Sequence, residues 1–222
     1  MNRKNREVIE ILYETHPDAK CELEHENALQ LLVATILSAQ ATDKKVNEVT
    51  REMFAKYQTL NDFLTITEEE LESYIKVIGL YKSKGRNLMK LFPILKEQHG
   101  GEVPRTMEEL TALPGVGRKT ANVVLSNAFG VPAIAVDTHV FRVSNRIGIV
   151  NEPNVEKTEE SLMKKIDRNL WIDVHHLLIF HGRRICTARA PQCGICPVNH
   201  LCTYYKKNRK LLIVKNDTKV KP

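Results

Sequence analysis

The segment TMEELTALPGVGRKTANVVLSNAFG, residues 106–130, predicts two helices joined by a tight turn. Thr106 has the spacing of a capping residue at the start of the first helix, and the proline of the turn ends that helix. Gly115 and Gly117 suit positive φ angles and leave backbone N–H groups uncovered. The second helix is expected to begin near Arg118, and it repeats its apolar residues at helical spacing: Ala121, Val124, Leu125 and Ala128.

The turn and the helix after it predict a site for an anion. The first N–H groups of a helix have no partners inside the helix, so here they point toward the turn. Phosphate is the obvious anion, and such contacts hold a nucleic-acid backbone without reading its sequence. Lys119 either holds that phosphate or acts as a nucleophile. A plain helix–helix connection explains the PGVG turn equally well when the turn is considered alone.

The rest of the chain also has helical patterns. We expect Thr42 and Thr67 to cap two further helices, and Pro93 to kink a third or end it early. The best alternating stretch, AIAV at residues 133–136, is too short to build a sheet. The sequence therefore predicts an all-α protein of roughly nine or ten helices, at about 11 residues per helix.

Composition indicates an ordinary globular protein with a basic surface. The chain has 222 residues, and its 33 Lys and Arg against 27 Asp and Glu give a net charge of +6, which suits a polyanionic partner. The N-terminus lacks the apolar core of a secretory signal, and the longest apolar stretch is shorter than the ~20 residues that cross a bilayer. We expect a soluble cytoplasmic protein without a membrane partner. Residues 206–222 are basic and mostly polar, and they predict a disordered tail.

A second motif is AVDTHVFRVSNRIG, residues 135–148. Its apolar residues mark a helix, so Asp137 falls at the N-cap. A structural cap accounts for Asp137 by itself, and a packed or surface position accounts for His139.

Four of the five cysteines lie close together in CTARAPQCGICPVNHLC, residues 186–202. The spacing C-x6-C-x2-C-x5-C suits metal ligation better than a disulfide framework. Four thiolates hold either zinc or a four-iron cluster, and the spacing mildly disfavours zinc because only one pair is close. The fifth, Cys21, is expected to be a small residue that is at least partly buried.

Together with the cysteines, four segments closely resemble the endonuclease III family of helix-hairpin-helix DNA glycosylases with an iron–sulfur cluster. These segments are LLVATILSAQATD (31–43), IGLYKSK (78–84), LPGVGRKTANVVL (113–125) and AVDTHVFRVSNRIG (135–148). The resemblance covers about residues 1–205, with the motifs in the same order. It implies an enzyme of base excision repair that removes oxidised pyrimidines from duplex DNA and nicks the abasic site by β-elimination.

The resemblance also implies roles for individual residues. Lys119 matches the family's nucleophile and Asp137 its essential carboxylate, which either stabilises cationic character at the sugar or handles the lysine's proton. The four cysteines match the ligands of a [4Fe–4S] cluster: Cys186, Cys193, Cys196 and Cys202. Residues expected to contact DNA are Gln40, Leu80, Gly115, Val116, Gly117, Arg118, His139 and Arg189.

The architecture implied by the resemblance is two helical domains with the active site in the cleft between them. Residues 21–131 would form a six-helix barrel that contains the helix-hairpin-helix. Residues 1–20 and 132–205 would form the iron–sulfur cluster domain. We expect a monomer that works at the nucleoid, with DNA containing damaged pyrimidines or abasic sites as its partner.

Two other functions fit part of the sequence. A monofunctional adenine glycosylase lacks the lysine nucleophile and usually has an additional C-terminal domain, so Lys119 and the short chain argue against it. A DNA-binding sensor with a cluster and no catalysis would not need both Lys119 and Asp137.

Overall fold

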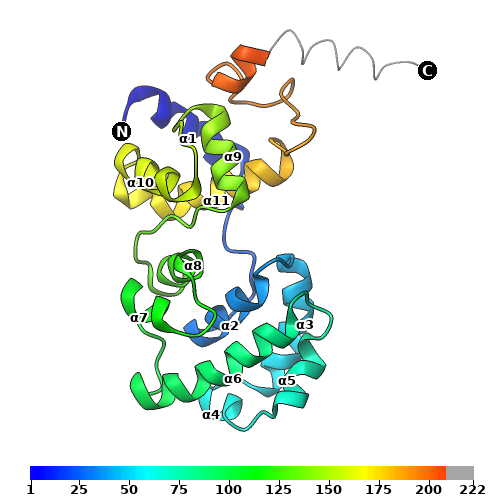
Figure 1. Ribbon diagram of the computed structural model, residues 1–222. Helices are drawn as coiled ribbons and strands as arrows, with labels where there is room; N and C mark the ends of the chain where they lie inside the picture. The colour runs from blue at the N-terminus through cyan, green and yellow to red at the C-terminus, as the bar shows by residue number, and fades with distance from the viewer. Residues whose placement is uncertain (209–222) are drawn as a thin grey trace, which may run out of the picture. The chain divides into compact units, whose positions relative to one another are not determined.

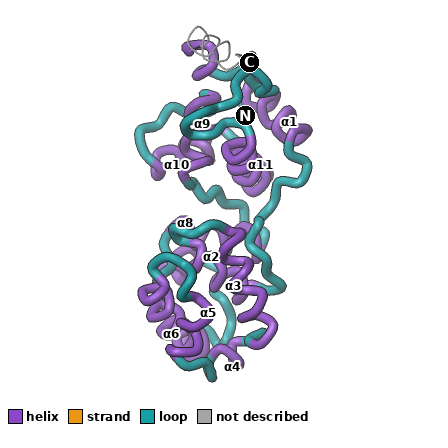
Figure 2. Tube along the Cα trace, turned by 90° about the vertical axis from the view of Figure 1, so that its right-hand side faces the viewer, coloured by secondary structure: helices purple, strands orange, loops and turns teal. Residues whose placement is uncertain are grey.

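Residues 1–208 are described by the structure, a computed structural model, and they are entirely helical (Figure 2). No strand occurs among them, and the AIAV stretch has no regular secondary structure. The predicted all-α class is therefore confirmed. Up to Arg184 the chain forms eleven α-helices and one short 3-10 helix, more than the nine or ten expected, because the helices at Leu60–Phe63 and Met107–Ala112 are unusually short.

The chain folds into two compact units. One unit is Cys21–Ala133, and the other combines Met1–Lys20 with the chain from Ile134 onward. Each unit has its own hydrophobic core. No helix in residues 1–208 is long and apolar enough to cross a membrane.

The unit Cys21–Ala133 is built around a buried helix. Its helices are α2 (Ala28–Ser38), α3 (Asp43–Lys56), α4 (Leu60–Phe63), α5 (Glu68–Ile75), α6 (Tyr81–Gln98), α7 (Met107–Ala112) and α8 (Arg118–Phe129). Eight successive residues of α2, Gln30 to Leu37, are buried, so this helix is covered on every side. It contacts α3, α6 and α8, which Figure 1 shows around it.

Threonine side chains start four helices of this unit. The predicted caps at Thr42, Thr67 and Thr106 are confirmed, since each hydroxyl accepts a hydrogen bond from the backbone N–H three residues later. A fourth cap, Thr59, forms the full reciprocal box with Asp62. These bonds satisfy donors that a helix start leaves without partners, and they fix where each helix begins.

Pro93 does not end its helix. The helix α6 runs from Tyr81 to Gln98 with Pro93 inside it, so the expected early end is wrong. Leu91, Phe92 and Leu95 are each no more than 1% exposed. Burial of this face outweighs the hydrogen bond that a proline cannot make.

The other unit contains α1 (Arg3–Thr15), α9 (Thr138–Ile147), α10 (Val155–Lys165), the 3-10 helix η1 (Arg168–Leu170) and α11 (Trp171–Arg184). Helix α11 packs against both α1 and α9 (Figure 1). Residues 203–208 are also helical, including the first three positions of the expected tail. The remainder of that tail, 209–222, lies outside the described residues.

Close packing of α9 on α11 depends on Gly182. A Cβ atom built on this buried glycine would lie 3.0 Å from both His139 Nδ1 and Val143 Cγ2, and 3.1 Å from Arg142 Nη2. Gly85 in α6 is also buried, but a Cβ there would meet Ile75 Cδ1 at 3.5 Å, an ordinary contact.

These two helical glycines give a matched test of packing. We expect Gly182→Ala to lower the free energy of unfolding by roughly 1–3 kcal/mol, because the methyl group pushes α9 away. Gly85→Ala is expected to raise it by roughly 0.5–1 kcal/mol, because alanine favours helix and fits the space. Thermal and denaturant unfolding of both variants measure this, and equal shifts of the same sign would contradict it.

Candidate functional site

The loop between α7 and α8 is a tight turn built by a proline and a glycine. Pro114 occupies the second position and Gly115 the third, where φ is +78°, and the Val116 N–H donates to the Leu113 carbonyl over 3.1 Å. This is the arrangement of a type II turn, which requires positive φ at its third residue. The Val116 side chain is 6% exposed and anchors the turn in the core.

Only one of the two turn glycines has the expected backbone. Gly117 has φ −92° and ψ 175°, an extended conformation open to any residue, so the expectation of positive φ is wrong there. Gly117 is the N-cap of α8, and a Cβ built on it would meet no atom within 4 Å. The constraint lies at Gly115, where a Cβ would approach Asn87 Nδ2 to 2.9 Å and Asn87 Cβ to 3.1 Å. Asn87 of α6 therefore packs directly against the turn.

Arg118 and Lys119 are the first two residues of α8, and both side chains are exposed. The apolar face of the same helix, including Ala121 and Val124, is completely buried. The helix is therefore fixed in the core while its positive end, the glycine turn and two cationic side chains face solvent. This combination attracts anions.

A second exposed feature of the unit Cys21–Ala133 is formed by Gln40 and Leu80. Among the described residues they are the only non-glycine positions with positive φ, at 55° and 61°. Left-handed backbone costs a residue with a Cβ atom roughly 1–2 kcal/mol, so it persists only where the surroundings impose it. Leu80 is also 57% exposed. Strain combined with an exposed apolar side chain marks these two loops as functional candidates.

In the other unit, Asp137 caps α9. Its Oδ1 accepts hydrogen bonds from the backbone N–H of His139 at 2.8 Å and of Val140 at 2.7 Å. The predicted N-cap is confirmed, and both bonds fall on one carboxylate oxygen. The ring Nδ1 of the half-buried His139 lies 3.1 Å from Arg142 Nη2. The structure thus places Asp137 and His139 at one helix start.

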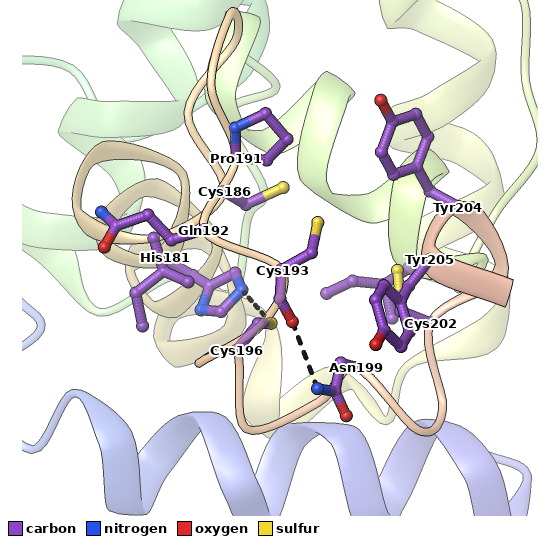
Figure 3. Close-up of a pocket in the computed structure, with 12 residues that line it drawn as sticks. His181, Cys186, Pro191, Gln192, Cys193, Cys196, Asn199, Cys202, Tyr204 and Tyr205 are labelled. Carbon is purple, nitrogen blue, oxygen red and sulfur yellow. Dashed lines mark hydrogen bonds between the residues drawn. The ribbon is translucent and has the colours of Figure 1, made fainter. Parts of the chain in front are cut away.

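The four clustered cysteines line a single small pocket that is partly open to solvent. Figure 3 shows their side chains around this space, with His181 and two tyrosines beside them. Burial raises the pKa of Cys196 to about 11 and also raises the pKa values of Cys193 and Cys202. These three thiols are therefore protonated at neutral pH when no metal is bound, and a metal must displace those protons when it binds.

The ligands of the pocket fit an iron–sulfur cluster. Four cysteines line one space, and a four-iron cluster takes four cysteine thiolates, one on each iron.

Two arginines of α9 organise the loop that holds the cysteines, and the sequence analysis did not identify them. Arg142 Nε donates to the Cys186 carbonyl at 3.1 Å. Arg146 donates to the Thr187 carbonyl at 2.8 Å and to the Ala188 carbonyl at 2.9 Å. The two arginines are four residues apart and therefore lie on one face of the helix, and this spacing is the feature of the sequence that could have identified them. Arg189, which follows Ala188, is exposed. The bonds from Arg146 to Thr187 and Ala188 therefore hold the segment on which Arg189 lies.

His181 connects the cysteine pocket to the interior of its unit. Its Nε2 lies 3.5 Å from Cys196 Sγ and its Nδ1 lies 3.2 Å from His16 Nε2. Burial lowers the pKa of His181 to about 4, so the ring is neutral at neutral pH and only one of these nitrogens carries a proton.

The fifth cysteine, Cys21, is expected to be a small residue that is at least partly buried. It is half-buried against the core of its own unit, Cys21–Ala133.

Comparison with known proteins finds two matching family models. The HhH-GPD superfamily base excision DNA repair protein model matches residues 33–168, and the iron-sulfur binding domain of endonuclease III matches residues 186–202. The second match spans the four pocket cysteines, and with the relatives it establishes a [4Fe–4S] cluster as the cofactor.

Similar proteins cover nearly the whole chain. Endonuclease III of Bacillus subtilis (strain 168) is 52% identical over 200 residues, 90% of this chain and 91% of the relative. A solved structure of a non-covalent endonuclease III–DNA complex is 50% identical with a TM-score of 0.88, covering 95% of this chain and 100% of the other. A trapped endonuclease III–DNA covalent intermediate is 50% identical with a TM-score of 0.87, covering 94% and 100%. The chain therefore belongs to the endonuclease III family, within the HhH-GPD superfamily of base excision DNA repair proteins.

Proposed function

We propose that this protein excises oxidised pyrimidines from duplex DNA with Lys119 as its nucleophile and then cuts the abasic site. The protein is a DNA glycosylase with abasic-site lyase activity, as its family establishes. One observation carries the choice of nucleophile: an exposed lysine stands in the first turn of α8, beside an anion-attracting turn. The relative with 50% identity that was trapped as a covalent DNA intermediate supports the same chemistry.

The reaction assigned to Lys119 begins with the loss of its ammonium proton, because only the neutral amine has an electron pair to donate. That pair attacks C1′ of the damaged nucleotide, and the bond between C1′ and the base breaks with its electrons leaving on the base. The nitrogen then loses a second proton while the sugar ring opens at the C1′–O4′ bond and O4′ takes up a proton. This leaves an imine at C1′, which acidifies the C2′ proton. Removal of that proton expels the 3′ phosphate and cuts the strand.

The role proposed for Asp137 is electrostatic. Positive charge develops at the sugar as the base departs, and a carboxylate stabilises it. The N-cap bonds support this role, because they fix the carboxyl group in one orientation while occupying only Oδ1. A group held in place beforehand needs no reorganisation when the charge appears.

The proposed DNA contacts fall into two classes. Backbone N–H groups and side chains at Gly115, Gly117 and Arg118 would hold phosphates without reading sequence. Since the Val116 N–H is used inside the turn, its contribution is to anchor the loop. Gln40 and Leu80 would fill the space that a flipped nucleotide leaves in the duplex. His139 and Arg189 would contact the backbone from the other unit.

We further propose that the unit Cys21–Ala133 is the DNA-holding barrel domain and that the other unit is the cluster domain. The [4Fe–4S] cluster, held by the four cysteines, would stabilise the loop that carries Arg189 by joining its two ends. We propose that the protein acts as a monomer at the nucleoid, and its net charge of +6 supports binding to DNA. Its partners are duplexes that contain damaged pyrimidines or abasic sites.

The two turn glycines provide a matched pair for the phosphate contact. We expect Gly115→Ala to weaken duplex binding by roughly a factor of 5–30, because a Cβ there is strained and collides with Asn87. Gly117→Ala is expected to change affinity much less, because its backbone is extended and its surroundings are open. Duplex affinity measured at several salt concentrations tests both. If both variants bound duplex DNA as tightly as the parent protein, the turn would be only a connector.

Lys119→Gln tests the nucleophile. The side chain is exposed, so we expect an unchanged melting temperature and retained affinity for abasic-site DNA. Because no amine remains, strand cleavage and the covalent adduct trapped by borohydride should both vanish. Trapping is measured on a gel with abasic duplex. A Lys119→Gln protein that forms the adduct at the normal rate would refute the assignment.

Asp137→Asn separates capping from catalysis. Asparagine caps helices about as well as aspartate, so stability should change by less than about 1 kcal/mol. Loss of the charge should slow single-turnover excision by on the order of a hundredfold or more. DNA binding should hold or tighten, because a carboxylate repels phosphates. A lowered melting temperature with normal turnover per folded molecule would assign Asp137 a capping role alone.

A further inference from the structure

Lys84 is a buried lysine with no role in the chemistry described above. It lies in the first turn of α6 and is 4% exposed, although lysine side chains are almost never fully buried unless paired. Its ammonium group donates a hydrogen bond to the backbone carbonyl of Leu37 at 2.8 Å. That carbonyl belongs to the last turn of α2, 47 residues earlier in the chain.

This bond satisfies a backbone carbonyl in the last turn of α2. The last four carbonyls of a helix have no partner inside it. Three of those in α2 are satisfied locally: Thr35 by the Ser38 hydroxyl, Ile36 by the Ala39 N–H, and Ser38 by the Ala41 N–H. The remaining carbonyl, Leu37, bonds to Lys84, and the positive charge also complements the negative end of the helix. Lys84 is thus the distant donor that fastens this helix end to another helix.

The two strained residues lie on the segments that Lys84 joins. Gln40 follows the end of α2 by two residues, and Leu80 is the N-cap of α6. The Lys84 backbone N–H donates to the Leu80 carbonyl at 3.1 Å, while its side chain holds Leu37. The two loops also touch, since a Cβ on Gly79 would lie 3.8 Å from the Gln40 carbonyl oxygen.

We propose that Lys84 is a positioning residue that locks Gln40 and Leu80 into one rigid pair for insertion into the DNA base stack. The proposal rests on the proposed function, in which those two residues fill the space of a flipped nucleotide. Two side chains can fill the space of one flipped nucleotide only if both enter the base stack together, so the distance between Gln40 and Leu80 must be fixed before DNA binds. The bond from the Lys84 ammonium group to α2 fixes this distance, because it joins the two segments from which the loops start. The left-handed backbone at Gln40 and Leu80 sets the direction of each side chain.

The test compares Lys84→Met with Lys90→Met. Methionine matches the length of lysine without its donor, and Lys90 is exposed on the same helix, so each variant loses one positive charge. With duplex DNA containing one oxidised pyrimidine, we expect Lys84→Met to slow single-turnover excision by roughly tenfold to a hundredfold. Lys90→Met should stay close to the parent protein. Borohydride trapping on single-stranded abasic DNA, which needs no wedge, should be normal in both and also counts the folded molecules.

A second variant separates positioning from general destabilisation. If Lys84 acts through Leu80, the double variant Lys84→Met with Leu80→Ala should be little slower than Leu80→Ala alone. If Lys84→Met folds poorly, Lys84→Gln, which retains a shorter donor, replaces it in both assays. Equal losses on duplex and single-stranded DNA, additive effects with Leu80→Ala, or no loss at all would each overturn the proposal. A parent protein that excises nothing would instead overturn the proposed function, and this inference with it.

Discussion

Burial of α2 is the constraint on which the unit Cys21–Ala133 depends. Eight of its residues in succession are buried, so the helix needs neighbours on every side. Helix α8 covers one side, and its exposed end carries Lys119. Helix α6 covers another side and reaches the α2 carbonyls through Lys84. The residues proposed to touch DNA in this unit therefore lie on, or directly beside, helices that share one core, and this core holds them in fixed positions.

In the unit that contains the cysteine pocket, one glycine and two arginines hold helix α9 and the cysteine loop in place. Gly182 lets α9 approach α11 closely, and its carbonyl accepts a hydrogen bond from Arg142 at 3.0 Å. Arg142 and Arg146 then bind backbone carbonyls at the entrance of the cysteine loop. Helix α9 thus carries Asp137 at its N-terminus and organises the cluster loop farther along. A displacement of α9 would disturb both the proposed catalytic carboxylate and the cluster, which ties cofactor binding to chemistry within one unit.

Local chemistry made much of this fold predictable. Helix starts at Thr42, Thr67, Thr106 and Asp137 follow from short side chains that bond to N–H groups three residues away or fewer. The turn at Pro114 and Gly115 follows equally from the residue types that a type II turn requires. The cysteine spacing indicated a metal site before any geometry was known. Each of these features depends on atoms within a few residues of one another.

By itself the sequence determined the helical class, the helix starts, the exposed hairpin with Lys119 and the set of four cysteines. The backbone at Pro93 and Gly117, and the long-range bonds of Lys84 and Arg146, were decided by the tertiary structure alone. Pro93 remains inside α6 because burial outweighs one missing bond, and Gly117 is extended because positive φ is needed only at Gly115. Nothing near Lys84 in the chain indicates that it reaches Leu37, and nothing near Arg146 indicates the carbonyl of Thr187. Those bonds join residues about forty or more positions apart, and packing of whole helices brings them together.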